Sequence, residues 1–142
     1  GFNRSHKNLE QVTQVEKEQL LSQSDIISLH LPLTTETRHF IDEADFQLMR
    51  PHTILINTAR GAIVNQNALY NALRKGQIAG AAVDVYDQEP PLPANCELFN
   101  APNLLMLPHV GYATKEAFAI RLEIVIQNIE KWLAGTAQNQ IL

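Results

Sequence analysis

The sequence predicts an α/β fold in which a parallel sheet is covered by helices on both faces. Short apolar runs of strand length alternate along the chain with amphipathic stretches of helix length. Parallel strands joined by helices bury both faces of their sheet, so this alternation favours that class. A length of 142 residues, with 45% hydrophobic and 18% charged residues, suits one globular domain with its own core.

Four apolar runs are expected to form the strands. The first comprises residues 25–31 and ends at Pro32, and the others are residues 53–57, 79–86 and 104–107. Ligands of such sheets bind beyond the carboxyl ends of the strands. The residues that follow each strand are therefore the candidates for a functional site.

Three helices are expected between and after the strands. The first runs from Asp42 to about Met49, and the second begins at Asn65 and ends at Gly76. The third is long, spans about residues 114–134 and begins with a capping threonine. Apolar side chains recur along it at spacings of three and four and are expected to pack it: Phe118, Leu122, Val125, Ile129 and Trp132.

Charge and composition argue against several partners. The 11 Lys and Arg residues against 15 Asp and Glu residues give a formal charge of −4, which does not suit nucleic acid. The apolar runs are shorter than the roughly 18 residues of a membrane span. The single Cys96 and the spacing of the five His residues predict neither a disulfide nor a metal site, and the cytosol is the expected compartment. The Lys and Glu residues between positions 7 and 18 are expected on a solvated helix face.

Arg60 follows the second strand and is a candidate anchor for a carboxylate. Its planar guanidinium matches two carboxylate oxygens, and Gly61 lets the chain turn sharply beside it. The alternative is a surface arginine on a tight turn.

Glu89 and His109 follow the third and fourth strands and could form an acid–base pair. A carboxylate bonded to one ring nitrogen fixes the tautomer and favours imidazolium, while the other nitrogen exchanges a proton with substrate. Taken singly, Glu89 could be a solvated loop carboxylate and His109 a structural histidine. Their joint placement with Arg60 favours catalysis.

Four blocks of sequence occur in an order that is characteristic of one family. They are SDIISLHLPLT at residues 24–34, INTARG at 56–61, AVDVY to Glu-Pro at 82–90, and PHVG at 108–111. The chain resembles the D-isomer-specific 2-hydroxyacid dehydrogenases, particularly the branch that reduces glyoxylate, hydroxypyruvate and 2-ketogluconate. The resemblance implies a Rossmann-like fold and reduction of a small 2-keto acid to the D-2-hydroxy acid with NAD(P)H.

The resemblance also implies a role for each matching residue. Arg60 would bind the substrate carboxylate, His109 would donate and accept the proton, and Glu89 would orient His109. Leu31, Pro32 and Thr37 would border the adenosine half of the cofactor, Thr58 and Ala59 the nicotinamide, and Asp84 the carboxamide; Arg60, His109 and Gly111 also count among the cofactor-binding residues. A homodimer is implied as well.

The first βαβ unit of that family, with its G-x-G-x-x-G turn, is missing from the sequence. The six glycines stand at positions 1, 61, 76, 80, 111 and 135, which do not form this phosphate-binding pattern. The separate substrate domain is missing too. Residues 1–142 are therefore expected to be a partial NAD(P)-binding domain that carries the catalytic residues and is inactive alone.

Asn3 is expected at the end of the family's second strand, where NAD-preferring members carry an acidic residue. Neutral Asn3 would not repel a 2′-phosphate, and Arg4, Ser5 and Lys7 could bind one. These residues favour NADP(H) over NAD(H). The alternative is that they only solvate a loop.

Two other functions fit parts of the pattern. Nicotinamide-responsive corepressors share the fold and retain the same Arg, Glu and His, so a binding protein is the main alternative. Formate dehydrogenase is also similar but pairs its histidine with a glutamine, and Glu89 argues against it.

Overall fold

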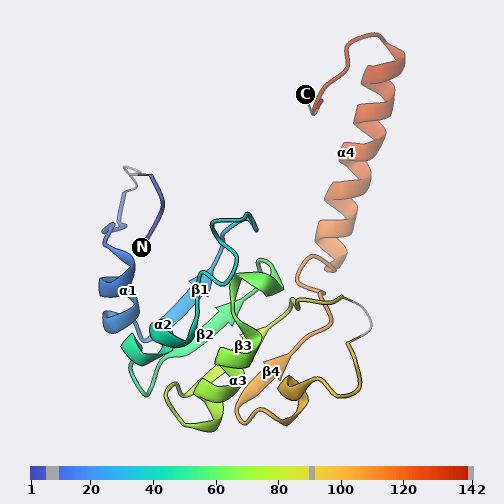
Figure 1. Ribbon diagram of the computed structural model, residues 1–142. Helices are drawn as coiled ribbons and strands as arrows, with labels where there is room; N and C mark the ends of the chain where they lie inside the picture. The colour runs from blue at the N-terminus through green and yellow to red at the C-terminus, as the bar shows by residue number, and fades with distance from the viewer. Residues whose placement is uncertain (6–9, 90–91, 141–142) are drawn as a thin grey trace. The chain divides into compact units, whose positions relative to one another are not determined.

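The computed structural model describes residues 1–5, 10–89 and 92–140, which divide into two compact units, 1–109 and 110–142. In chain order the first unit contains α1 (Lys17–Gln23), β1 (Ile26–Leu29), α2 (Glu43–Leu48), β2 (Ile54–Asn57), η1 (Gly61–Ile63), α3 (Gln66–Arg74), β3 (Gly80–Val83), η2 (Glu97–Asn100) and β4 (Leu104–Met106) (Figure 1). The second unit contains α4 (Lys115–Leu133).

The four strands form one parallel sheet in the order β1-β2-β3-β4 (Figure 1). The predicted α/β class, with a parallel sheet and connecting helices, is confirmed. All four strands are shorter than the apolar runs that predicted them, since one or more residues at the ends of each run lie outside the ladder. The carboxyl ends of the strands lie along one edge of the sheet, as the register shows.

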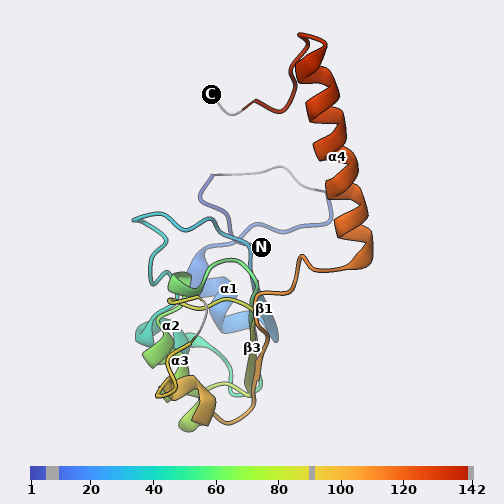
Figure 2. The ribbon, with the colours of Figure 1, turned by 90° about the vertical axis from the view of Figure 1, so that its right-hand side faces the viewer.

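Within the first unit the helices cover only one face of the sheet, so the described residues of this unit do not provide the predicted covering of both faces. Figure 2 shows α1, α2 and α3 on the same side of the sheet. Ile27, Leu29 and Leu55 point to that side and are buried. The alternate residues are open: Ile26 is 63% exposed and Leu105 is 58% exposed. Side chains alternate between faces, so apolar strands expose half of their side chains when one layer of helices is missing.

The predicted helix starts are confirmed by their caps. Asp42 and Asp45 form a reciprocal capping box at α2. The Asn65 side chain accepts hydrogen bonds from two backbone N–H groups of α3, and the Thr114 hydroxyl accepts one from Ala117. Each cap satisfies N–H groups that lack partners inside the helix.

Two other expectations for helices are met only in part. Glu18 is exposed in the first turn of α1, as expected, but the described charged residues before position 17 precede the helix. Lys17 is largely buried, with its ammonium 2.8 Å from Asp45. Within the second unit, none of the residues of α4 is buried and Trp132 is 70% exposed, while the Phe118 ring contacts that of Tyr112. The residues of this unit alone therefore do not bury the apolar face of the helix. Periodicity identifies an apolar face but not what covers it.

Within the described ranges, no helix is long and apolar enough to cross a membrane. The same residues contain no group of three or more His, Cys, Asp or Glu side chains that could hold a metal ion.

Candidate active site at the carboxyl ends of the strands

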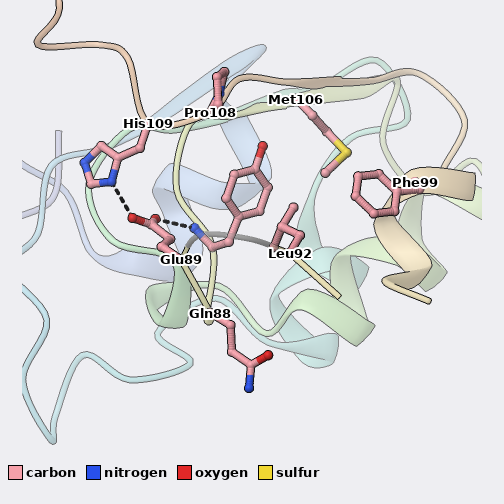
Figure 3. Close-up of a pocket in the computed structure, with 8 residues that line it drawn as sticks. Gln88, Glu89, Leu92, Phe99, Met106, Pro108 and His109 are labelled. Carbon is pink, nitrogen blue, oxygen red and sulfur yellow. Dashed lines mark hydrogen bonds and ion pairs between the residues drawn. The ribbon is translucent and has the colours of Figure 1, made fainter. Parts of the chain in front are cut away.

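Glu89 and His109 meet beyond the ends of β3 and β4. Glu89 lies in the loop after β3 and His109 three residues after the end of β4, and His109 Nδ1 is hydrogen-bonded to Glu89 Oε2 (Figure 3). A carboxylate can only accept, so Nδ1 carries the proton in this bond. The side chains are 25% and 40% exposed, so the pair is partly shielded but open to small molecules. The structure therefore brings the two predicted members of the acid–base pair into direct contact.

The second oxygen of Glu89 is also held. The backbone N–H of Tyr86 donates to Glu89 Oε1 at 2.8 Å, as the second dashed line in Figure 3 shows. Bonds to both oxygens fix the plane of the carboxylate, and that plane in turn fixes the imidazole.

His109 occupies the left-handed region of backbone conformation, with φ of 56°. This region costs a residue other than glycine roughly 1–2 kcal/mol. Strained backbone persists where the surrounding structure imposes it, and such residues cluster at functional sites. The turn at His109 is therefore consistent with a side chain placed for chemistry rather than for packing.

A buried asparagine shapes the turn that carries Arg60. Asn57 is 1% exposed; its Nδ2 donates to Arg60 O at 3.0 Å, and its Oδ1 accepts from the Ala59 N–H at 3.1 Å. The guanidinium of Arg60 is exposed and donates to Ala59 O at 2.6 Å. The turn is thus fixed from inside the sheet, while the charged group stays at the surface.

Gly61 brings the Arg60 turn against the loop after β3. A Cβ built on Gly61 would lie 2.0 Å from the carbonyl carbon of Tyr86, so no other residue fits there without movement. This close approach makes the chain beside Arg60 touch the chain that holds Glu89. The three predicted catalytic residues thus belong to adjoining loops.

A separate cleft of about 760 Å³ contains five of the predicted cofactor residues. Leu31 and Pro32 line it from the end of β1, and Thr58, Ala59 and Arg60 line it from the end of β2, together with His30 and Leu33. Its walls combine apolar and polar side chains, with the charged Arg60 among them, a lining typical of small-molecule sites.

Two further cofactor candidates lie near these strand ends but have structural partners. The Thr37 hydroxyl donates to Pro32 O at 2.6 Å and so ties the loop together. Asp84 is 3% exposed, and its backbone N–H donates to Asn57 O at 3.0 Å.

The residues expected near a 2′-phosphate lie apart from the catalytic loops. Asn3 Nδ2 donates to Ser5 O at 2.8 Å, and Asn3 shares a cavity of about 300 Å³ with Leu31. Arg4 is 86% exposed and forms an ion pair with Glu36 at 3.2 Å. Lys7 lies outside the described residues. Gly111 belongs to the second unit.

Sequence reasoning missed Asn57 and Tyr86, which hold the site together. The sequence did contain a signal for Asn57: it is a polar amide at the end of an apolar strand, and a buried amide needs hydrogen-bond partners. Tyr86 gave only a weaker signal, namely that a buried tyrosine requires a partner for its hydroxyl. That partner is Leu107 O, to which the hydroxyl donates at 2.8 Å. Burial, with a contribution from the Asp84 carboxylate, raises the pKa of Tyr86 above its usual value, which keeps the phenol protonated as a donor.

Residues 1–111 match the family model described as the D-isomer specific 2-hydroxyacid dehydrogenase, NAD binding domain. The chain belongs to this family. The predicted family is therefore confirmed, and the sheet described above is the nucleotide-binding part of such a dehydrogenase.

Similar proteins include named enzymes of this family. The chain is 50% identical over 121 residues to a glyoxylate reductase of Thermococcus litoralis, with 85% of this chain and 36% of the relative covered. It is 44% identical over 129 residues to a glycerate dehydrogenase of Methylorubrum extorquens, with 89% and 41% covered. The chain thus spans well under half the length of these relatives.

A similar solved structure is that of an acyclic imino acid reductase, Bsp5, in complex with NADPH and D-Arg. Its TM-score is 0.86 at 34% identity, with 100% of this chain and 45% of that chain covered. Other similar structures contain NAD. A nicotinamide dinucleotide is therefore the cofactor class of the family.

Proposed function

We propose that the protein containing this chain reduces a small 2-keto acid of the glyoxylate, hydroxypyruvate or 2-ketogluconate type to its D-2-hydroxy acid, with NAD(P)H as cofactor. The hydrogen bond between Glu89 and His109 carries the proposal, because it supplies an oriented proton donor in a chain of this dehydrogenase family. The glyoxylate reductase at 50% identity supports the substrate class.

The proton is the part of the reaction that this chain would handle. His109 Nε2, on the far side of the ring from Glu89, protonates the oxygen of the substrate carbonyl as negative charge develops there. The carboxylate of Glu89 stabilises the imidazolium before transfer and keeps the ring oriented. When bound, the reduced nicotinamide supplies the hydride that adds to the carbonyl carbon.

Arg60 would hold the substrate's acid group. Its guanidinium is exposed at the cofactor cleft, and its turn adjoins the loop of Glu89 through Gly61. A two-point contact fixes the keto acid in one orientation, and such orientation lowers the entropic part of the barrier.

The cleft residues would hold the cofactor. Leu31, Pro32 and Thr37 would border its adenosine half, and Thr58, Ala59 and Asp84 its nicotinamide half. The size and walls of the cleft support these roles for Leu31, Pro32, Thr58 and Ala59, whereas Thr37 and Asp84 are assigned by the resemblance alone. Gly111 would contribute from the following loop.

We propose a preference for NADP(H), based on Asn3, Arg4 and Ser5. No carboxylate stands at Asn3 to repel a 2′-phosphate, and Arg4 is accessible to one. Glu36 works against the preference because it already pairs with Arg4, although an exposed pair of this kind is weak and can be displaced.

The test is a steady-state screen of the full-length protein with glyoxylate, hydroxypyruvate and 2-ketogluconate, each with NADPH and with NADH. We expect turnover of at least one acid and a higher kcat/KM with NADPH. Binding of the cofactor without turnover of any acid would contradict the proposal and favour the corepressor-like alternative. Light scattering of the same protein checks the homodimer, and cell fractionation checks the cytosolic location; both stay predictions.

A further inference from the structure

We propose that Tyr86 is a positioning residue that sets the Glu89–His109 pair through its hydroxyl. The inference rests on the proposed function, since it concerns the geometry of the same acid–base pair. Tyr86 touches neither substrate nor the reacting atoms in this account. It acts through the two residues that do the chemistry and through the chain that carries each of them.

Tyr86 contacts all three loops of the site. Its backbone N–H donates to Glu89 Oε1 at 2.8 Å, and its hydroxyl donates to Leu107 O at 2.8 Å, two residues before His109. Its backbone packs directly against Gly61, the neighbour of Arg60. One residue therefore links the Glu89 side chain, the main chain that leads to His109 and the Arg60 turn.

The hydroxyl is the part of this arrangement that depends on the side chain. Any residue at position 86 except proline would offer the N–H to Glu89. Only the phenol reaches Leu107 O, because this oxygen belongs to the segment between β4 and His109. The bond therefore ties the strained turn at His109 to the loop that carries its carboxylate.

Local packing does not replace this bond. Tyr86 is 8% exposed but lines a cavity of about 380 Å³ together with Leu92, Phe99 and Met106. Figure 3 shows these three side chains on the side of Glu89 opposite His109. The Tyr86 ring lies beside an open cavity and can shift when its hydroxyl is removed. The imidazole of His109 would then be displaced relative to the carboxylate of Glu89.

The experiment uses the full-length protein with Tyr86→Phe, which keeps the ring and the backbone N–H and removes only the hydroxyl. Tyr70→Phe is the matched control, because the Tyr70 hydroxyl meets only a weak 3.4 Å contact from Arg74 on the surface of α3. For each variant we would measure kcat and KM for the 2-keto acid. The proton resonance of His109 Nδ1, assigned by its loss in His109→Asn, would be recorded in parallel.

We expect Tyr86→Phe to lower kcat about tenfold with KM changed less than about twofold. A displacement of a reacting group by 1 Å can cost about 100-fold in rate, and the loss of one hydroxyl should move the imidazole by less than that. The Nδ1 resonance should shift toward its position in Glu89→Gln, and Tyr70→Phe should match the wild type in both readouts.

Unchanged kcat and an unchanged resonance in Tyr86→Phe would overturn the inference. If the wild type turns over no acid, the proposed function fails, while the resonance still tests the positioning of His109. A folded variant with a low thermal midpoint but a wild-type resonance would show a merely structural role and would also overturn the inference.

Discussion

The loops after β3 and β4 differ sharply from the amino-terminal segment that is expected to select the cofactor. Glu89 is hydrogen-bonded through both oxygens, one to His109 and the other to the backbone of the buried Tyr86. Arg4, in contrast, is 86% exposed and held by one surface ion pair. Groups that must be placed to a fraction of an ångström are fixed by converging bonds, whereas a group that attracts a phosphate needs only charge and reach.

The contrast makes different variants fail in different ways. Changes at the strand ends should lower kcat steeply, and changes in the amino-terminal segment should alter only the choice of cofactor. The predictions below run from the steepest expected loss to the mildest.

His109→Asn should reduce kcat of the full-length enzyme by about 100-fold or more, the usual cost of losing general acid–base help. Asparagine tolerates positive φ better than most residues, so the turn should survive and the loss should report on the imidazole. Steady-state kinetics, with circular dichroism as a check of folding, measure this. Turnover close to that of the wild type would remove His109 from the proton transfer.

Gly61→Ala should lower the free energy of unfolding by about 3 kcal/mol, because the new methyl group collides with the Tyr86 backbone. It should also reduce kcat more than tenfold, as the loop that holds Glu89 is pushed away. Chemical denaturation and kinetics measure the two effects.

Gly76→Ala is the matched control for Gly61→Ala. Gly76 has φ of +65°, but nothing lies within 4 Å of its added Cβ, so only backbone strain of about 1–2 kcal/mol is expected, with kcat unchanged. Equal losses of activity in the two variants would show that close packing at Gly61 has no special role.

Arg60→Lys should raise KM for the keto acid about tenfold with a smaller effect on kcat, because one ammonium cannot reproduce the two-point contact of the guanidinium. Initial rates over a range of substrate concentrations measure this. Unaltered kinetics would make the assignment of the carboxylate anchor wrong.

Asn3→Asp should lower the ratio of kcat/KM for NADPH to that for NADH about fivefold, since the new carboxylate repels a 2′-phosphate. Glu36→Gln should raise the same ratio slightly by releasing Arg4 from its ion pair. If neither variant changes this ratio, the amino-terminal segment does not distinguish the 2′-phosphate of NADPH from the 2′-hydroxyl of NADH.

The presence and order of the strands and the starts of three helices could be predicted because they follow local rules. Pro32 and the run before it marked β1, Asn65 marked the start of α3, and the parallel arrangement then placed Glu89 and His109 along one edge. The resemblance supplied their roles, and the structure supplies their contact.

The parts that sequence could not give depend on contacts between distant residues. The hydroxyl of Tyr86 reaches Leu107 only once β3 and β4 lie side by side, and Gly61 meets Tyr86 only once β2 and β3 do. The exposed apolar side chains on one face of the sheet and on α4 were not predicted, because an apolar pattern does not show which element, if any, packs against it. Lys17 was assigned to solvent because its partner Asp45 lies on another helix.

A double-mutant cycle on Glu89 and His109 tests most directly whether the two residues act as one unit. The values of kcat for Glu89→Gln, His109→Asn and the double variant would be compared in the full-length enzyme. If the carboxylate works only through the imidazole, the double variant should be no slower than His109→Asn alone. Losses that multiply in the double variant would show that Glu89 and His109 act independently and would contradict the account.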